Sequence, residues 1–347
     1  MNVAGYGHIL SNTASLRDAK VAVLGSSPIS LLAAHIWSLF GAHVTVYEKN
    51  ENFGGAWSKF EQEGSQYPIS THIIMPNELP AAILELFGAK ARFWNMLPVE
   101  FDVNTQKSSC FPSKLSSEYS GLPFDYTSRS GGLAQDLLSS LSDQEVGFRY
   151  EKVDLVAELD DFIKITNSRG ETSIYDYIFV TPAIQSSFEI KGKIVDIKYD
   201  SHINKSVVYE YESGGCFGSA FHHIKGNTPV REVQTFDAST GRLAIVVKLS
   251  RLGTFEDHEW IRETLQKVLG MALKKSALKT LGAVTYRNTR MNLQSQYNLG
   301  SHAARIVLPT IVSADEARHN DDHRYRFSQD ISLVLNDIAF YKSLLFR

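Results

Sequence analysis

The stretch that decides the fold is VAVLGSSPISLLAAHIWSLFGAHVTVYEKNENFGGAW, residues 21–57. It begins with a continuous apolar run at 21–24, which is typical of a buried strand in a parallel sheet. A short turn leads into an apolar segment at 29–40, which we predict to be a helix that ends at Gly41. Residues 44–47 form a second predicted strand. Strand, tight turn, helix and strand in this order predict a βαβ unit.

The turn after the first strand has part of the glycine pattern of a dinucleotide site. Such a site favours three glycines, for the tight turn, for the approach of the pyrophosphate and for close packing of the helix on the strand. Gly25 holds the first position, whereas Ser27 and Ser30 hold the second and third, so the pattern is weakened but not lost. Pro28 suits the start of the helix, because the first turn makes no use of its missing N–H. We therefore predict four cofactor contacts in this turn: Gly25, Ser26, Ser27 and Ser30.

Glu48 ends the second predicted strand, 23 positions after Gly25. A carboxylate at this place accepts hydrogen bonds from the ribose hydroxyls of an adenosine, and its charge argues against a 2′-phosphate and so against NADP. The alternative is an ordinary surface glutamate at a strand end. At Gly54 and Gly55 the backbone can approach the cofactor phosphates a second time, although a Gly-Gly pair can also be a simple turn. Trp57 completes the predicted cofactor residues.

The composition is that of an ordinary soluble globular protein of 347 residues, with 43% apolar residues, 21% charged residues and a formal net charge of −3. Charges of both signs are mixed along the chain, which argues against a nucleic-acid partner but leaves room for a local basic pocket. The two cysteines, Cys110 and Cys216, lie far apart and suit a reducing compartment. The sequence has no signal-peptide pattern, and no apolar stretch approaches the roughly twenty residues that span a bilayer. We therefore expect a cytoplasmic protein without a membrane partner.

Beyond the βαβ unit, helical and strand patterns are mixed. Helices are predicted at 133–141, 259–275 and 331–345. Strands are predicted at 152–159, 162–166, 177–181, 206–211, 230–236 and 243–249. The pair Asp160-Asp161 marks a hairpin turn between the first two of these strands. This order predicts that a β-rich segment interrupts the first domain and that the chain returns to that domain at its end.

These segments together resemble the FAD-dependent amine-oxidase superfamily, and within it the UDP-galactopyranose mutases more than the amine oxidases proper. That family has a glycine-rich first turn, a ribose-binding glutamate, a Gly-Gly segment, and then a stretch that ends in a histidine near the isoalloxazine. YPISTHII at 67–74 looks like this stretch, and the resemblance implies that His72 lies at the flavin. A histidine in an apolar stretch can also be a core residue, and this alternative stays open.

Two further segments resemble the mutases. PVREVQTF at 229–236 is similar to their strand with a diphosphate-contacting arginine, which implies that role for Arg231; an exposed strand residue is the alternative. YRFSQDI at 325–331 resembles their segment before the last helix, which implies that Tyr325 lines the substrate pocket. The sequence departs from the family at 320–323, which reads NDDH where the family has a glycine-arginine pair. Two acids at that place are hard to reconcile with a UDP-sugar substrate.

The resemblance implies an α/β fold: a Rossmann-like FAD-binding domain with an inserted α+β, mixed-sheet substrate domain. The first domain would be discontinuous and would comprise residues 18–66, 131–185 and 300–347. The substrate domain would comprise residues 67–130 and 186–299.

The implied function is that of an FAD-dependent oxidoreductase of the amine oxidase-like superfamily. Its substrate would be a small molecule, anionic or sugar-nucleotide-like among the options, and its catalytic residues would be His72, Arg231 and Tyr325. Two alternatives stay open. One is a flavin-dependent sugar-nucleotide mutase, and the other is a remodelled, non-catalytic relative that has lost FAD and binds a nucleotide or a partner enzyme.

Two other polar clusters each have two interpretations. Tyr286, Arg287 and Arg290 could line a pocket for an anionic substrate or stand at a strand edge, and the second interpretation is favoured. His319 and His323 have a ligand spacing that would suit a helix, but they lie in a polar stretch with no third ligand in sight. We therefore expect no metal site.

Overall fold

The structure is a computed structural model, and its described part begins at Asp18 and ends at Leu308. The residues that it describes are 18–39, 41–62, 64–71, 92–93, 99–110, 124–125, 132–142, 144–212, 220–239, 242–251, 253–270 and 273–308. His72, Tyr325 and the helix predicted at 331–345 lie outside these residues.

The first sheet is parallel and contains the predicted βαβ unit. Its strand order is β21-β13-β1-β2-β9, and every neighbouring pair runs parallel. The strands are β1 (Lys20–Leu24), β2 (His43–Tyr47), β9 (Gly147–Arg149), β13 (Tyr177–Val180) and β21 (Ile306–Val307). Helix α2 (Pro28–Leu39) connects β1 to β2. The predicted strand–helix–strand order is therefore confirmed, and this part of the fold is Rossmann-like.

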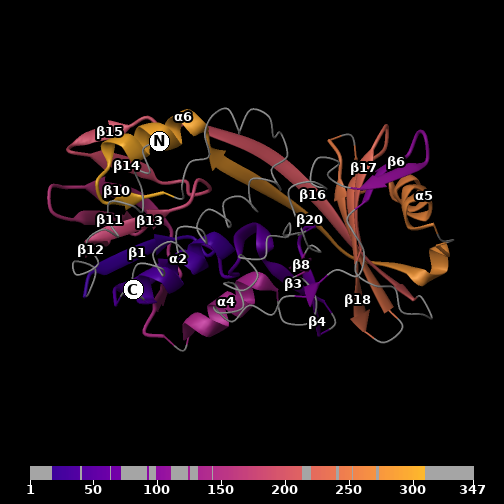
Figure 1. Ribbon diagram of the computed structural model, residues 1–347, viewed down its shortest axis with the longest axis horizontal. Coiled ribbons are helices and arrows are strands. Elements are labelled where there is room, and N and C mark those ends of the chain that lie inside the picture. The colour runs from indigo at the N-terminus through magenta and orange to yellow at the C-terminus, as the bar shows by residue number, and fades with distance from the viewer. Residues whose placement is uncertain are drawn as a thin grey trace, which may run out of the picture.

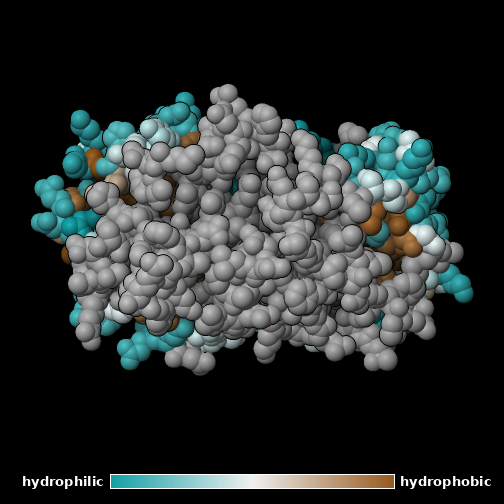
Figure 2. Space-filling model, viewed as in Figure 1, coloured by the Kyte–Doolittle hydropathy of each residue, from teal (hydrophilic) through white to brown (hydrophobic). Residues whose placement is uncertain are grey.

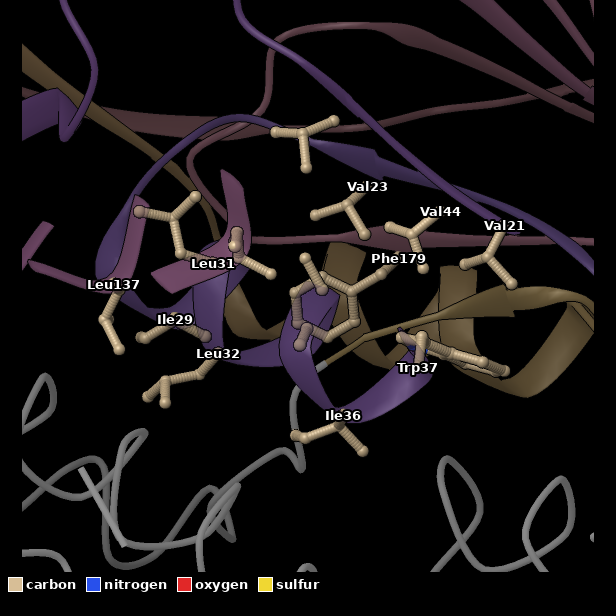
Figure 3. Close-up of a cluster of buried hydrophobic side chains, with 14 of the residues drawn as sticks. Val21, Val23, Ile29, Leu31, Leu32, Ile36, Trp37, Val44, Leu137 and Phe179 are labelled. Atoms are coloured by element: carbon tan, nitrogen blue, oxygen red, sulfur yellow. The ribbon is translucent and has the colours of Figure 1, made fainter. Parts of the chain in front are cut away.

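Helix α2 has no polar stripe because it is buried on nearly all sides. Ten of its twelve residues are buried, as expected for a helix that is apolar all round. In Figure 3 its side chains lie against Val23 and Phe179 of the sheet and against Leu137 of α4 (Leu133–Ser142). Full burial of such an aliphatic or aromatic side chain contributes about 1.5–3 kcal/mol. This cluster therefore fixes the helix, and with it the turn that precedes the helix.

His35 adds polar contacts between α2 and α4 inside this core. It is fully buried, its Nε2 donates to the carbonyl of Leu137 at 3.0 Å, and its Nδ1 accepts from the side-chain amide of Gln144 at 3.2 Å. Both contacts together require a neutral imidazole. Burial lowers the pKa of His35 to about 4, against a smaller opposite effect of the Leu137 carbonyl. The ring is therefore neutral near pH 7.

The second sheet packs against the first. Its order is β12-β11-β10-β14-β15. The strands are β10 (Val153–Glu158), β11 (Ile163–Asn167), β12 (Thr172–Tyr175), β14 (Ser187–Ile190) and β15 (Lys193–Val195). β10 and β11 form the hairpin predicted around Asp160-Asp161. The two sheets share one hydrophobic cluster, which includes Leu24 of β1 and Val156 of β10.

The third sheet has seven strands in the order β20-β16-β19-β18-β17-β6-β7. They are β6 (Val99–Asp102), β7 (Lys107–Cys110), β16 (Tyr199–Glu212), β17 (Ala220–Lys225), β18 (Val230–Ser239), β19 (Arg242–Leu249) and β20 (Leu278–Met291). β16 and β20 are fourteen residues long and pair along almost their whole length. In Figure 1 these two strands run from the end of the molecule that carries the first two sheets to the end that carries α5 (His258–Leu269). The predicted α+β, mixed-sheet region is therefore confirmed.

The predicted helix 259–275 was too long. Helix α5 ends at Leu269, because Gly270 adopts the left-handed conformation with φ 63° and so terminates it. A second helix, α6 (Leu293–His302), was not predicted, because its sequence is polar and has no clear apolar stripe. Asn292 caps it by accepting a hydrogen bond from the amide of Ser295.

The chain returns to the first sheet after α6. The carboxylate of Glu158, at the end of β10, accepts hydrogen bonds from the amides of Ala304 at 2.8 Å and Arg305 at 3.3 Å. β21 then pairs with β13. This return is the pattern predicted for a discontinuous first domain, whereas the exact boundaries stay a prediction.

Short elements complete the described part of the chain. They are β3 (Lys59–Gln62), β4 (Ser65–Pro68), β5 (Arg92–Phe93), β8 (Phe124–Asp125) and two 3-10 turns at Gly55–Trp57 and Lys275–Ala277. Figure 2 shows the face seen in Figure 1, where hydrophilic residues prevail among the coloured atoms at both ends and a small apolar patch lies near α5. None of the described helices combines the length and the apolar character that a bilayer span requires.

Candidate cofactor and substrate site

A cavity of about 1120 Å³ lies at the carboxyl ends of β1 and β2 and reaches to β20. One end, which we call the ribose end, is lined by the turn at Gly25 to Ser27 and by Glu48 to Asn50. The other, which we call the far end, is lined by Ser70, Thr71, Lys248 and Tyr286. Arg287 and Arg290 line the cavity further along β20, toward the first two sheets. In open parallel sheets, ligands bind outside the carboxyl ends of the strands. The cavity therefore has the position expected of a ligand site.

Glu48 lines the cavity directly after β2, and its carboxylate is held by neighbours. It is 4% exposed. Its Oε2 accepts from the amide of Ser26 at 3.0 Å and from the hydroxyl of Ser26 at 2.6 Å. Its Oε1 accepts from the amide of Asn50 at 2.9 Å and from the side-chain Nδ2 of Asn50 at 3.1 Å. The interpretation as a plain surface glutamate therefore does not hold, because the group is buried in the wall of a cavity.

Gly25 adopts a φ of 85°, as the tight first turn requires. A Cβ at this position would also meet Cδ1 of Ile184 at 3.0 Å. The structure thus gives a physical reason for the one glycine of the pattern that the sequence retains.

The two serines that replace glycines interact with each other. The hydroxyl of Ser27 accepts from the amide of Ser30 at 3.3 Å, as a helix N-cap does, and it lies 3.0 Å from the hydroxyl of Ser30. The hydroxyl of Ser30 donates to the carbonyl of Leu24 at 3.3 Å, and Ser30 is fully buried between helix and strand. Ser27 lines the cavity and Ser30 does not. The predicted contact of Ser30 with a cofactor therefore has no support here, since its side chain serves the packing of α2 on β1.

Of the two glycines in the Gly-Gly segment, one also lines the cavity and the other does not. Gly54 donates its amide to the hydroxyl of Ser26 at 2.9 Å, and a Cβ there would meet Cβ of Ala134 at 3.0 Å. Gly54 is thus a packing and turn residue behind the cavity wall, whereas Gly55 and Trp57 line the cavity. The predictions for Gly55 and Trp57 are compatible with this geometry.

The far end is built around a buried ion pair that the sequence did not reveal. Glu232 on β18 is 1% exposed, and its carboxylate lies 3.4 Å from Nζ of Lys248 on β19, a side chain with 16% exposure. The hydroxyl of Thr71 also donates to Glu232. Lys248 and Thr71 line the cavity, and Glu232 holds both from behind. These three residues are separated in sequence, so no local pattern could indicate their proximity.

Arg231 is not brought to the cavity. Its side chain is 44% exposed, and its Nε lies 3.9 Å from Oε1 of Glu232. The register of β18 against β19 shifts between Val230, which pairs with Leu249, and Glu232, which pairs with Lys248. Such a β-bulge breaks the strict alternation of faces along a strand. The neighbouring acid thus reaches the site, and the role predicted for Arg231 has no support in the described structure.

Tyr286 at the far end donates its hydroxyl to Oγ of Ser70 at 2.7 Å. Burial raises its pKa to about 12, with a smaller contribution from the charge of Glu232 and an opposing one from the Ser70 contact. β20 is the edge strand of its sheet, yet Tyr286, Arg287 and Arg290 also line the cavity. The cluster thus lies both on an edge strand and in the cavity wall, and its role toward an anionic substrate stays a prediction.

Three comparisons with known proteins agree with this architecture. A family model described as an NAD(P)-binding Rossmann-like domain matches residues 23–87. A 4,4′-diapophytoene desaturase (4,4′-diaponeurosporene-forming) of Staphylococcus haemolyticus is 33% identical over 70 residues, which are 20% of this chain. These residues make up only 14% of the desaturase. The sequence similarity is therefore confined to a minor part of that relative.

The solved structures match along nearly the whole chain. Putrescine oxidase, in its wild-type form bound to putrescine, has a TM-score of 0.60 and 13% identity, with 95% of this chain and 99% of that chain covered. The p-nitrophenol 4-monooxygenase of Pseudomonas putida has a TM-score of 0.56 and 15% identity, with 94% and 81% covered. At such identities the likeness concerns the fold. Together with the Rossmann-like sheet and the inserted mixed sheet, it shows that this chain shares the fold of these two enzymes.

Proposed function

We propose that this protein is an FAD-dependent oxidoreductase that acts on a small polar substrate. The observation that carries the proposal is the single cavity that joins Glu48 and the turn at Gly25 to the polar far end. One end of it has an acid placed for an adenosine ribose, and the other end has charged and hydroxyl groups that would face a substrate. The fold shared with oxidases supports the same proposal.

The residues of the ribose end fit FAD. A dinucleotide at this position has its pyrophosphate at the N-terminus of the first helix and its adenosine ribose at the acid that ends the second strand. Gly25 and Glu48 supply both features. The volume of about 1120 Å³ lies just above the range of roughly 300–1,000 Å³ that holds most small ligands, which suits an extended cofactor with a substrate beside it. FAD, when bound, would accept a hydride from the substrate.

The side chains of the cavity would bind and orient the cofactor and the substrate. Glu48 would accept hydrogen bonds from ribose hydroxyls, and Ser27 would face the diphosphate with its hydroxyl. At the far end, Lys248 would present a positive charge that Glu232 keeps in place.

The proposed substrate is polar and carries an anionic group. Positive side chains outnumber acids in the cavity lining: Lys49, Lys152, Lys248, Arg287 and Arg290 stand against Glu48, Glu151 and Asp200. A guanidinium can bind a carboxylate or a phosphate in bidentate fashion. Arg287→Ala is expected to raise the KM for an anionic substrate more than it lowers kcat, which a steady-state assay with acidic and neutral amines or hydroxy acids would measure.

A non-catalytic, remodelled relative is the second candidate, because one observation favours it. The N-terminus of α2 offers few amide donors to a diphosphate, since Pro28 has no N–H and the amide of Ser26 is donated to Glu48. The mutase alternative rested in part on Arg231, which does not line the cavity, and it stays a prediction.

An absorbance spectrum of the purified protein, before and after addition of FAD, tests the proposal. We expect flavin bands that are released by heat, and loss of at least about tenfold in FAD affinity in Glu48→Ala, since hydrogen bonds to a charged group are worth about 1.5–3 kcal/mol. Glu51→Ala, at an exposed position three residues on, is the matched control and should bind FAD as the wild type does. A colourless protein with no thermal shift in FAD would refute the proposal and favour the remodelled relative.

A further inference from the structure

The carboxylate of Glu48 already has four hydrogen-bond donors around it. Two come from Ser26, its amide at 3.0 Å and its hydroxyl at 2.6 Å, and two come from Asn50, its amide at 2.9 Å and its Nδ2 at 3.1 Å. An ionised carboxylate offers about four lone-pair sites. A ribose hydroxyl can therefore reach Glu48 at full strength only where one of these donors gives way.

The donors from Ser26 are fixed. Ser26 is 1% exposed, and its hydroxyl accepts from the amide of Gly54 at 2.9 Å while it donates to Glu48. The hydroxyl thus connects the first turn, the second-strand acid and the Gly-Gly segment. Movement of this side chain would break contacts with two other segments.

The side chain of Asn50 is free to move by comparison. Asn50 is exposed and lines the cavity, and the contact of Nδ2 with Glu48 is the longest of the four. Its loss would leave the backbone contact of Asn50 with the same oxygen in place. Of the four donors, this one has the geometry of a replaceable partner.

We propose that Ser26 is a positioning residue that aims Glu48 at the ribose of a bound adenosine, and that the side-chain amide of Asn50 occupies the place of a ribose hydroxyl until the nucleotide binds. The inference rests on the proposed function, because it assumes an adenosine in the cavity. It assigns a role to Ser26 that differs from a phosphate contact, and it assigns a role to Asn50, which no sequence pattern indicated.

The test compares two probes by isothermal titration, ADP and 2′,3′-dideoxy-ADP, which lacks both ribose hydroxyls. The ratio of the affinity for ADP to the affinity for 2′,3′-dideoxy-ADP isolates the contribution of the ribose hydroxyls. In Ser26→Ala we expect the ratio to fall about tenfold, because Glu48 is no longer held in the orientation in which it accepts a hydrogen bond from the ribose. In Asn50→Ala we expect it to rise about fivefold, because ADP no longer displaces a competing donor. Glu51→Ala is the matched control, since Glu51 is exposed and does not line the cavity, and it should leave the ratio unchanged.

A double-mutant cycle separates positioning from a general effect on structure. In a Glu48→Gln background, Ser26→Ala should change the ratio no further if Ser26 acts through Glu48. A ratio that is unchanged in Ser26→Ala, or that falls equally in both backgrounds, overturns the role of Ser26. A ratio that is unchanged in Asn50→Ala overturns the role of Asn50, and this arm stands even if Ser26→Ala fails to fold. If the wild type binds FAD but shows a ratio near one, the inference fails and the proposed function stands. If it binds neither FAD nor ADP, both fail.

Discussion

The two ends of the cavity are built in opposite ways. The ribose end comes from one continuous stretch, in which Gly25, Ser26, Glu48 and Asn50 are brought together by a single βαβ unit. The far end comes from separate segments: Ser70 and Thr71 after β4, Glu232 on β18, Lys248 on β19, and Tyr286 on β20. An end built locally can be recognised in sequence, whereas an end built from distant strands has no sequence signature of its own.

The forces that hold the two ends also differ. At the ribose end, neutral donors surround one carboxylate. At the far end, a buried carboxylate is compensated by the charge of Lys248. Removal of one partner from a buried ion pair leaves an uncompensated charge, which costs more than the loss of a neutral hydrogen bond. The difference predicts an order of effects on stability.

The largest effect is expected at the far end. Glu232→Ala should lower the free energy of unfolding by about 3–5 kcal/mol, because it leaves Lys248 without its buried counter-charge. Urea unfolding would measure the loss. Arg231→Ala, the adjacent residue at the bulge, should change the free energy by less than about 0.5 kcal/mol. Equal effects of the two substitutions would contradict the comparison.

The next largest effect is that of pH on stability, and it arises from His35 in the core between α2 and α4. The pKa of His35 is lowered to about 4 by burial, so the unfolded chain binds a proton there between roughly pH 6.5 and 4 while the folded chain does not. The contribution of His35 is complete above pH 6.5 and is lost as the pH falls toward 4, by up to roughly 3 kcal/mol. Urea unfolding at several pH values should show that the free energy of unfolding depends less steeply on pH in His35→Gln than in the wild type. An unchanged slope would show that His35 does not control it.

A smaller effect concerns Tyr286. Tyr286→Phe removes the hydrogen bond to Ser70 at 2.7 Å and should cost about 1 kcal/mol of stability. Because this residue lies at the far end, FAD affinity should stay within about twofold, whereas turnover of a bound substrate should fall. Burial raises the pKa of Tyr286 to about 12, so ultraviolet titration should show no ionisation of this tyrosine below pH 11. A large loss of FAD affinity would mean that the two ends are not separate.

The smallest effect is expected in the first turn. Ser27→Ala removes the hydroxyl that accepts from the amide of Ser30 and should cost about 1 kcal/mol, whereas Ser27→Gly should cost only a few tenths. Thermal unfolding of both variants would show the difference. If Ser27→Gly also binds FAD more tightly, the serine is a compromise between capping of the helix and the approach of a diphosphate. Equal losses in both variants would show that the hydroxyl does not act as a cap.

Much of the ribose end could be predicted from the sequence. The apolar run before Gly25, the apolar helix and the acid after the second strand identified the βαβ unit and placed Glu48 in the cavity wall. The error there was one of role, since Ser30 and Gly54 serve packing and turn geometry. A residue at a motif position can support the site without touching the ligand.

The far end could be predicted only in part. Tyr286, Arg287 and Arg290 stood out as a polar cluster, and they do line the cavity. On β18 the sequence pointed to Arg231, which does not line the cavity, and gave no signal for Glu232 beside it. His72 and Tyr325 lie outside the described residues, so their roles stay predictions.

The sequence by itself determined the βαβ unit of the first sheet and the turn between its first strand and its helix, because such a unit is specified by the periodicity and turn residues of a short stretch. Only the tertiary structure decided the far end, for two physical reasons. The strand pairing that brings Thr71, Glu232 and Lys248 together joins distant segments, and no local pattern encodes such pairing. The β-bulge at Arg231 then decides which of two adjacent charged residues is buried behind the cavity wall, where Glu232 contacts Lys248 and Thr71. A one-residue shift of register moves side chains to the other face of a sheet, and that choice is fixed by the partners of the strand.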